Sequence, residues 1–346
     1  MADSDKRVTI YDIAHEMNVS ATTVYRALNG KGRINIETRN RILETAENMG
    51  YKANLAASSM SRKAIRIGVV IDLYFPGFHD EIISGMKDTF GQLYDFKVDG
   101  IFTPLDEAYD RKTQMEKLKS LVQKVDAIVF APFNTNADYV EFIDECAEKG
   151  LPIITCINDI PNSKRAGTVY EDTRIVGDMG AQLLSMIAGG AGNALLVSNK
   201  DIQNQMNLID GFSNRLRLNG NAPLGVFETQ NNERIGYYIT DMLIKEHPGL
   251  RGIFVGMSQS MGVCNRIIEE GLARKVKLVC VDIFKEMAEM LEKDVVQMTI
   301  YQQTREIGRE AIMLAYDFLT NDHSNEIISL SKPLILIKSN YSDYLY

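Results

Sequence analysis

Five residues of one short predicted helix have the types and spacing that suit contact with DNA. They lie within the segment Thr9 to Gly30, TIYDIAHEMNVSATTVYRALNG, which contains two amphipathic stretches separated by a turn at Asn18-Val19. The residues left exposed on the second stretch are Ala21, Thr22, Tyr25, Arg26 and Asn29. A small polar surface with one cation can hydrogen-bond to base edges and phosphates in a major groove. This spacing therefore predicts a DNA-reading helix.

Three helices must hold that surface in place. In the first, Ile10, Ile13, Ala14 and Met17 recur at helical spacing, and in the second Val24, Ala27 and Leu28 do so. Ser20 is placed to cap the second helix, because its hydroxyl can accept from free backbone N–H groups of the first turn. A third helix from about Ile36 to Met49 is expected to turn Ile42, Leu43, Ala46 and Met49 inward. Together the three helices predict one small apolar core.

The motifs of this region resemble those of the Lac repressor (LacI/GalR) family of bacterial regulators. YDIAHEMNVSATTVYRALNG is similar to the family signature YDVA…GVS…TVSRVLN, Gly50-Tyr51…Asn54 to its G-Y-x-x-N, and 55–60 to its hinge helix. The resemblance implies a DNA-binding head over 1–53, a hinge helix and linker over 54–64, and an effector-binding and dimerisation domain over 65–346. By the resemblance, Ala21, Thr22 and Arg26 fall on the positions that read operator bases. The full set of candidate DNA-binding residues is Thr9, Tyr11, Ser20, Ala21, Thr22, Thr23, Tyr25, Arg26, Asn29, Asn54, Ala57 and Met60.

Two of these positions have specific consequences. Met60 falls on the family's leucine that is wedged into the minor groove, and Met is apolar and flexible enough for that role. Tyr25 departs from the family, which has a small serine there.

The distribution of charge agrees with a DNA-binding head. Of the 38 Lys+Arg and 46 Asp+Glu residues, the first 66 positions hold 11 and 7, a net of +4, which leaves 27 and 39, a net of −12, for the remainder. Attraction to phosphates is local within a Debye length of about 8 Å at physiological salt. The head can therefore suit a polyanion although the whole chain has a net charge of −8.

From Ile65 onward, ten short apolar runs rich in β-branched residues alternate with amphipathic stretches of helical length. This is the pattern of parallel sheets covered by helices on both faces. We expect two lobes of about five strands each: the first over about 65–167 and 303–324, the second over about 168–300 and 325–340. The resemblance implies a periplasmic-binding-protein-like domain with three crossovers, near Gly167–Asp172, Thr299–Gln303 and Asn321–Glu326.

Ligands of open parallel sheets bind beyond the carboxyl ends of the strands. The residues there are mainly amides, carboxylates and aromatics, which suit the hydroxyls and the C–H face of a sugar or sugar derivative. The candidate effector-binding residues are Asp72, Phe75, Phe78, Asn134, Asp159, Asn207, Asn231, Ser258, Asp282 and Gln302.

The family resemblance assigns some of these and questions others. It places Asp282 on the aspartate that binds sugar hydroxyls, Gln302 on the crossover glutamine, and Asp159 on an acidic residue after the fourth strand. Two positions depart: Leu208 stands for the family arginine, and Met257-Ser258 stands for Asn-Asp. Nearby amides could replace the lost hydrogen bonds, or the pocket could prefer a less hydroxylated or larger molecule.

The sequence thus predicts an allosteric regulator. We expect a homodimeric repressor that binds a pseudo-palindromic operator in double-stranded DNA. One alternative is a nucleobase or nucleoside effector stacked on Phe75 and Phe78. Another is a DNA-binding head fused to a sugar-modifying enzyme, although no phosphate loop or nucleophile elbow is present.

Further expectations follow from the cysteines, the histidines and the apolar runs. The four cysteines are dispersed without C-x-x-C spacing, which predicts buried, reduced thiols, and the scattered histidines indicate neither a metal nor a cofactor. No signal segment and no run of about 20 apolar residues is present, so we expect a cytoplasmic protein with no membrane partner.

Overall fold

The computed structural model describes residues 8, 10–28, 35–49, 63–71, 78–104, 110–133, 136–200, 203–321 and 327–345. The chain divides into two compact units, 1–62 and 63–346. Each unit is described by itself. The predicted hinge residues 54–62 lie outside the described residues.

The first unit contains the three predicted helices. They are α1 (Ile10–Glu16), α2 (Ala21–Leu28) and α3 (Ile36–Asn48). Their fully or nearly buried core consists of Ile13, Ala14, Val24, Ala27, Ile42 and Ala46. One prediction is corrected: Leu43 is 40% exposed, because it lies one position around α3 from the buried Ile42 and so faces away from α1 and α2.

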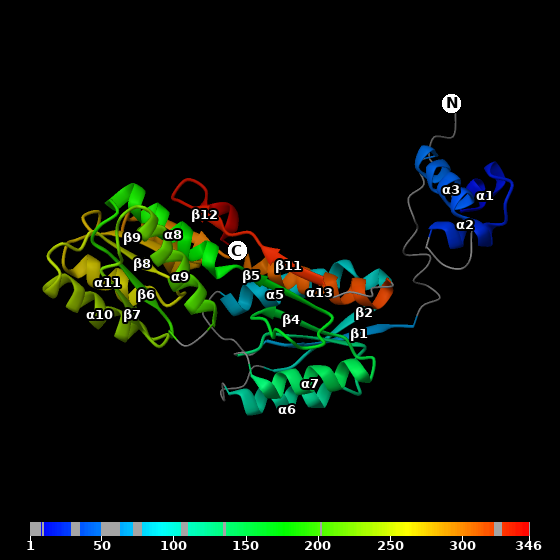
Figure 1. The fold of residues 1–346 in the computed structure, drawn as a ribbon, viewed down its shortest axis with the longest axis horizontal. Helices are drawn as coiled ribbons and strands as arrows, with labels where there is room; N and C mark the ends of the chain where they lie inside the picture. Colours follow the sequence, from blue (N-terminus) through cyan, green and yellow to red (C-terminus); the bar gives the residue numbers. More distant parts are fainter. Residues whose placement is uncertain are drawn as a thin grey trace. The chain divides into compact units, whose positions relative to one another are not determined.

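The second unit is built from two α/β lobes (Figure 1). The described strands of the first lobe are all parallel, in the order β11-β5-β4-β3-β1-β2. These strands are β1 (Ile65–Val70), β2 (Val98–Phe102), β3 (Ala127–Phe130), β4 (Ile153–Ile157), β5 (Gly167–Glu171) and β11 (Ile327–Ser331). On one face lie α5 (Phe78–Gln92) and α13 (Thr304–Thr320), and on the other α6 (Arg111–Leu121) and α7 (Ala137–Glu148).

The second lobe repeats this plan. Its strand order is β12-β10-β9-β8-β6-β7, and β12 is the antiparallel member of the described sheet. The strands are β6 (Asn193–Val197), β7 (Gly225–Glu228), β8 (Gly252–Val255), β9 (Lys277–Val281), β10 (Met298–Tyr301) and β12 (Leu334–Leu336). One face is covered by α8 (Thr173–Ala188) and α9 (Gln203–Leu218), the other by α10 (Glu233–Glu246), α11 (Met261–Glu269) and α12 (Lys285–Glu292).

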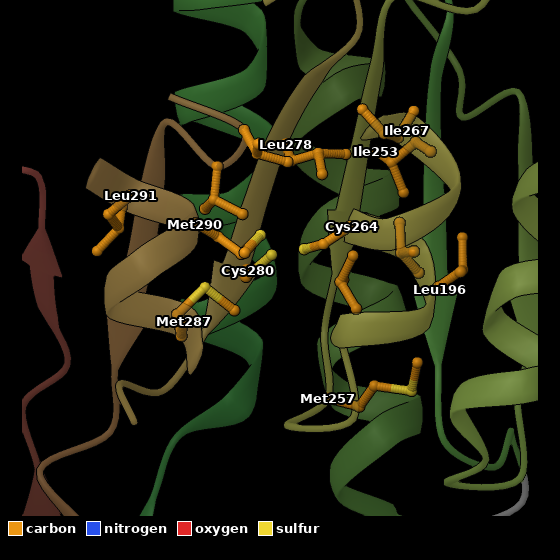
Figure 2. Packing of buried hydrophobic residues seen from close by; sticks show 14 of the residues in the cluster. Leu196, Ile253, Met257, Cys264, Ile267, Leu278, Cys280, Met287, Met290 and Leu291 are labelled. Atoms are coloured by element: carbon orange, nitrogen blue, oxygen red, sulfur yellow. The ribbon is translucent and has the colours of Figure 1, made fainter. Parts of the chain in front are cut away.

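The apolar core of the second lobe is rich in sulfur. Figure 2 shows Cys264 of α11 beside Cys280 of β9, with Met287 and Met290 next to them, and Met257 belongs to the same cluster. All four cysteines of the chain are buried and free, which confirms the prediction of buried, reduced thiols. Continuous apolar strands such as β8 are buried on both faces, as parallel strands between two helical layers must be.

Among the described elements, the chain changes lobe at three places: Asp172, 302–303 and 332–333. The third change was predicted near Asn321–Glu326, and that boundary is corrected by the strand pairing. β11 pairs in parallel with β5 in the first lobe, and residues 168–171, which had been assigned to the second lobe, form β5 itself. Pairing with β11 satisfies backbone groups along an edge of β5 that would otherwise stay open.

Several helix pairs approach each other backbone to backbone through glycines, among them α5 with α13 and α8 with α9. A Cβ built on Gly85 of α5 would lie 2.0 Å from the carbonyl oxygen of Arg305 in α13. In the second lobe, a Cβ on Gly177 of α8 would lie 2.0 Å from the carbonyl oxygen of Leu208 in α9. Each of the two pairs therefore depends on a residue without a side chain at the crossing point.

Candidate functional site

The head presents the side of α2 that faces away from its core. Val24 and Ala27 are fully buried, so by helical spacing positions 22, 25 and 26 fall on the opposite side. Ser20 caps the helix as predicted, since the Thr23 N–H donates to its Oγ over 3.1 Å, and the two hydroxyls are also bonded at 2.8 Å.

The other predicted DNA contacts are described only in part. For five of them the structure describes the helical backbone but not the side chain: Tyr11 in α1, and Ala21, Thr22, Tyr25 and Arg26 in α2. Outside the described residues lie Thr9, Asn29, Asn54, Ala57 and Met60.

In the second unit, three of the predicted effector residues lie together. Asp282 follows β9 with a φ of 63°, and the residue is only 5% exposed. Its Oδ2 accepts hydrogen bonds from Ser258 Oγ over 2.6 Å and from Gln302 Nε2 over 3.2 Å. The carboxyl ends of β8, β9 and β10 thus bring one carboxylate, one hydroxyl and one amide to the same point, a combination that can bind a polar ligand.

Burial governs the ionisation of this carboxylate. It raises the pKa of Asp282 to about 7, with the hydrogen bond from Ser258 opposing the rise and the charge of Glu81 adding to it. Asp282 Oδ1 is buried, and no hydrogen-bond donor in the described part of the chain reaches it.

Glu81 of α5 joins the two lobes beside this point. Its carboxylate accepts from Tyr301 Oη of β10 over 2.9 Å and from Thr304 Oγ1 at the start of α13 over 2.8 Å. Burial raises the pKa of Glu81, and the two hydrogen bonds moderate that rise. Tyr301 and Thr304 flank the second change of lobe, so Glu81 ties a helix of the first lobe to the segment through which the chain returns.

A second polar contact joins the lobes at the end of β4. Asn204 of α9 donates from Nδ2 to Asn158 Oδ1, while Thr173 Oγ1 donates to the carbonyl oxygen of Asn204 over 2.7 Å. Ile157, just before Asn158, has a φ of 68°, which is strained for a β-branched residue. Backbone strain of this kind is concentrated at ligand sites and switch regions.

Glu171 is a further acidic residue at this level, and the sequence reasoning missed it. It is the last residue of β5, is 4% exposed, and neither carboxylate oxygen is reached by a donor from the described residues. Burial raises its pKa well above the ordinary range, and the charges of Asp282 and Asp172 raise it further. Recognising GTVYE as a strand would have pointed to Glu171 by the same strand-end rule that pointed to Asp282.

Four other predicted residues have different surroundings. Asp159 forms a two-point ion pair with Arg165, at 2.7 Å to Nε and 2.9 Å to a terminal nitrogen, and its Oδ1 also accepts from the Ile160 N–H. Asn207 Oδ1 accepts from Gln203 on the same helix. Asn231 is exposed in a turn with a φ of 52°, and Phe78 begins α5 half-buried. Outside the described residues are Asp72, Phe75 and Asn134.

The two departures from the family pattern lie in the apolar core. Leu208 is 2% exposed within the α8–α9 layer, and Met257 is 4% exposed, with its sulfur accepting from Thr229 Oγ1 over 2.6 Å. Neither side chain takes part in the Asp282 cluster. Leu208 and Met257 therefore extend the core, whereas Ser258, the other half of the second departure, donates to Asp282.

A cavity of about 580 Å³ adjoins the cluster between α5 and the β9–α12 connection. Its wall includes Glu81, Arg305, Ile283 and Phe284, the last two being the residues directly after Asp282. A separate cavity of about 690 Å³ is lined by residues such as Lys277 and Met298, at the starts of β9 and β10. The smaller cavity borders the segment that follows β9, but Asp282, Ser258 and Gln302 are not part of its wall.

Among the described residues, no group of three or more His, Cys, Asp or Glu side chains is arranged to hold a metal ion. The described helices include none with the length and apolar character to span a bilayer.

The comparisons with known proteins cover both units. Residues 9–54 match the family model of bacterial regulatory proteins, lacI family, and residues 67–323 match the periplasmic binding protein domain. Catabolite control protein A of Priestia megaterium is 27% identical over 272 residues, which cover 77% of this chain and 79% of that protein. The HTH-type transcriptional regulator DegA of Bacillus subtilis is 28% identical over 209 residues, 60% of each chain.

Among solved structures, GanP, a glucose-galactose binding protein from Geobacillus stearothermophilus, has a TM-score of 0.70. It covers 81% of this chain and 99% of its own at 19% identity, a likeness that shows the fold. The matched families and relatives are regulators and binding proteins, not enzymes. The head motif, the two-lobed α/β fold and the two family models, one over each unit, show that this chain belongs to the lacI family of DNA-binding bacterial regulators, with a periplasmic-binding-protein-like domain.

Proposed function

We propose that this protein is a transcriptional repressor that binds a pseudo-palindromic operator as a homodimer and releases or tightens its hold when a small molecule binds between its lobes. Two copies would place their α2 helices in successive major grooves of the operator. The segment that contains Met60 would pair with its twin at the minor groove between them.

The observation that carries the sensor half of this proposal is the junction around Asp282. Its carboxylate binds Ser258 and Gln302, and the neighbouring Glu81 holds Tyr301 and Thr304 at the second change of lobe. A ligand bound at Asp282 would alter both the hydrogen bonds and the charge at that junction. Lobe angle and ligand occupancy would then be coupled, typically by about 1–3 kcal/mol.

A sugar or sugar derivative is the ligand class that best suits this chemistry. Carboxylate, hydroxyl and amide groups together supply both donors and acceptors for hydroxyl groups. The likeness in fold to a glucose-galactose binding protein supports the same class. A nucleobase effector is included in the test below.

The DNA half is tested by substituting Arg26. Arg26→Ala should weaken binding to the selected operator by about 1–3 kcal/mol, the value of one good base contact, while binding to unrelated DNA changes less. Operator fragments selected from random DNA, measured by fluorescence anisotropy at one fixed salt concentration, would show this. Arg274→Ala is the matched control, because Arg274 is 71% exposed in the second lobe and pairs with Asp294. Equal operator selectivity in Arg26→Ala and the control would refute the assignment of this helix face.

The sensor half is tested with ligands and Asp282→Ala. Full-length protein is unfolded thermally with sugars, polyols, sugar phosphates and nucleobases, since a ligand at 100 times its Kd adds about 2.7 kcal/mol to the native state. A compound that shifts the Tm should also change operator affinity, and both effects should be lost in Asp282→Ala. Asp210→Ala is the control, because its carboxylate is 60% exposed on α9. A compound that binds Asp282→Ala as tightly as the unaltered protein would show that the site lies elsewhere.

A further inference from the structure

The most unusual group in the structure is the carboxylate of Glu171. Glu171 ends β5, is 4% exposed, and both oxygens are buried without a donor from the described residues. An isolated carboxylate is costly to bury, and buried charges in proteins are normally paired. Structural need does not explain it, because β5 is already paired with β4 on one side and β11 on the other.

The fold brings this group to Asp282. The chain leaves Glu171 through Asp172, and the α8 helix that follows packs against β9 and β10, so the end of β5 lies beside the ends of those strands. The charge of Asp282 adds to the effect of burial in raising the pKa of Glu171, which places the two carboxyls within reach of each other's field. Asp282 Oδ1 is likewise buried and lacks a donor from the described residues. Three buried oxygens that no described donor reaches thus lie at the ends of two strands that belong to different lobes.

The surroundings add acceptors. Gln259, next to Ser258, has a buried Oε1 that no described donor reaches. Glu81 adds a third carboxylate at this junction, and its charge acts on Asp282. The neighbouring cation Arg305 is bound to Asp88, on the surface of α5. The site is consequently rich in carboxyl groups whose pKa is raised by burial. A cationic ligand that supplies N–H donors would hold these groups in their ionised form and be bound by them.

A metal ion fits this arrangement less well than an organic cation. The described residues contain no group of three or more His, Cys, Asp or Glu side chains arranged for metal binding. Divalent cations such as Ca²⁺ need six to eight oxygen ligands at short distances. An ammonium group needs only two or three acceptors, which the two carboxylates can supply.

We propose that the effector carries a protonated amine, and that Glu171 and Asp282 bind it together as its counter-ions, one from each lobe. This inference rests on the proposed function and specifies its ligand: an amino sugar or a comparable amino-polyol, not a neutral sugar. Ser258 and Gln302 would orient the Asp282 carboxylate toward the ammonium group. Because the two carboxylates belong to different lobes, the amine would hold those lobes together.

The test uses matched ligands on the full chain. Glucosamine, galactosamine and mannosamine are each compared with the parent sugar and with the N-acetyl derivative, in which the amine is neutralised, by calorimetric titration. At least one amine should bind about 10-fold or more tightly than both neutral partners, as expected for a hydrogen-bonded charge. Glu171→Gln should abolish that preference, so that the amine binds no more tightly than its neutral partners.

Two further variants complete the design. Asp282→Asn should also abolish the preference, which keeps the test decisive if Glu171→Gln fails to fold. Glu148→Gln makes the same chemical change at a carboxylate that is 67% exposed on α7, and it should alter nothing.

The outcomes separate this inference from the proposed function. If neutral sugars bind as tightly as the amines, the amine site is wrong and the sugar-responsive regulator stands. An amine preference that survives both Glu171→Gln and Asp282→Asn would place the cation elsewhere and overturn the inference. If neither the amines nor any neutral compound binds, both proposals fail.

Discussion

Replacing Gly85 by alanine should separate two helices that now touch. Gly85 lies on α5, where its backbone meets α13, and an added Cβ would lie 2.0 Å from the Arg305 carbonyl oxygen and 2.9 Å from its carbon. Ordinary van der Waals contact begins at 3.4 Å, so the new methyl group is about 1.4 Å too close. The obstacle is backbone, which no side-chain rotation can move. The helices would have to shift apart.

The cost can be worked out from this geometry. Overpacking of a close-packed site costs about 1–3 kcal/mol, and a backbone obstacle favours the upper end. Alanine in place of glycine within a helix returns about 1 kcal/mol. The net expectation is a loss of about 2 kcal/mol of unfolding free energy, which lowers the Tm of a domain of this size by about 4–8 °C.

The matched control lies on the same helix. Gly91 is exposed, and a Cβ built on it has nothing within 4 Å, so Gly91→Ala should keep the helix-propensity gain and raise stability by up to about 1 kcal/mol. Calorimetry of the full chain would compare the two variants. Gly85 is also one turn from Glu81, so Gly85→Ala should weaken the link of Glu81 to Thr304 and reduce any effector response of operator binding.

Equal stability of Gly85→Ala and Gly91→Ala would refute the close approach of α5 and α13. If Gly85→Ala lowers stability but leaves the effector response unchanged, the close packing of α5 and α13 is supported. The same outcome would show that this packing does not contribute to the coupling between the lobes.

Three further outcomes are expected from the described contacts. Because the pKa of Asp282 rises from 3.8 to about 7 on folding, the folded state binds more protons between those values, and the stability contributed by this group falls by about 4 kcal/mol as the pH rises through that window. Urea unfolding at several pH values should show a shallower fall for Asp282→Asn, and identical slopes would contradict the raised pKa. Leu208→Ala should cost about 2–5 kcal/mol in urea unfolding, since the side chain is 2% exposed, and a loss under about 1 kcal/mol would contradict its burial. A thiol reagent should label the four buried cysteines only after unfolding, because burial raises the pKa of Cys156, and the neighbouring Cys264 thiol together with burial raises that of Cys280; rapid labelling of the native protein would show that these sites open.

Much of the fold could be predicted because its signals are local. The continuous apolar runs of β3 and β8 are buried on both faces, which only a sheet between two helical layers allows. Ser20 caps α2 because a hydroxyl at that position meets free N–H groups of the first turn. Leu43 shows the limit of such reasoning, since an apolar residue one position from the buried stripe of a helix still faces outward.

The strands β5 and β11 were missed because their apolar signal is weak. GTVYE begins with glycine and ends with glutamate, and IISLS is interrupted by serine. Both are stabilised by pairing in parallel with each other, a contact between segments 160 residues apart in the register Ile327 to Gly167. A local sequence pattern cannot indicate that a strand pairs with a segment so far away in the chain. The predicted lobe boundary near residue 325 was therefore wrong.

The residues of the candidate site also fall into those that the sequence could predict and those that it could not. Asp282, Ser258 and Gln302 could be proposed from the sequence, because each follows an apolar run and parallel strands place their carboxyl ends on one edge. Glu171 and Glu81 could not, because a glutamate on an unrecognised strand or on the first turn of a helix looks like any exposed charge.

The sequence by itself determined the head motif, the parallel α/β architecture and the kinds of polar groups at the strand ends, since these depend on periodicity and on residue type. Only the tertiary structure decided which lobe the last strands join and which carboxylates are buried together. Those outcomes depend on long-range pairing and on exclusion of water from Glu171 and Asp282, and burial is a property of the folded chain that no single segment carries.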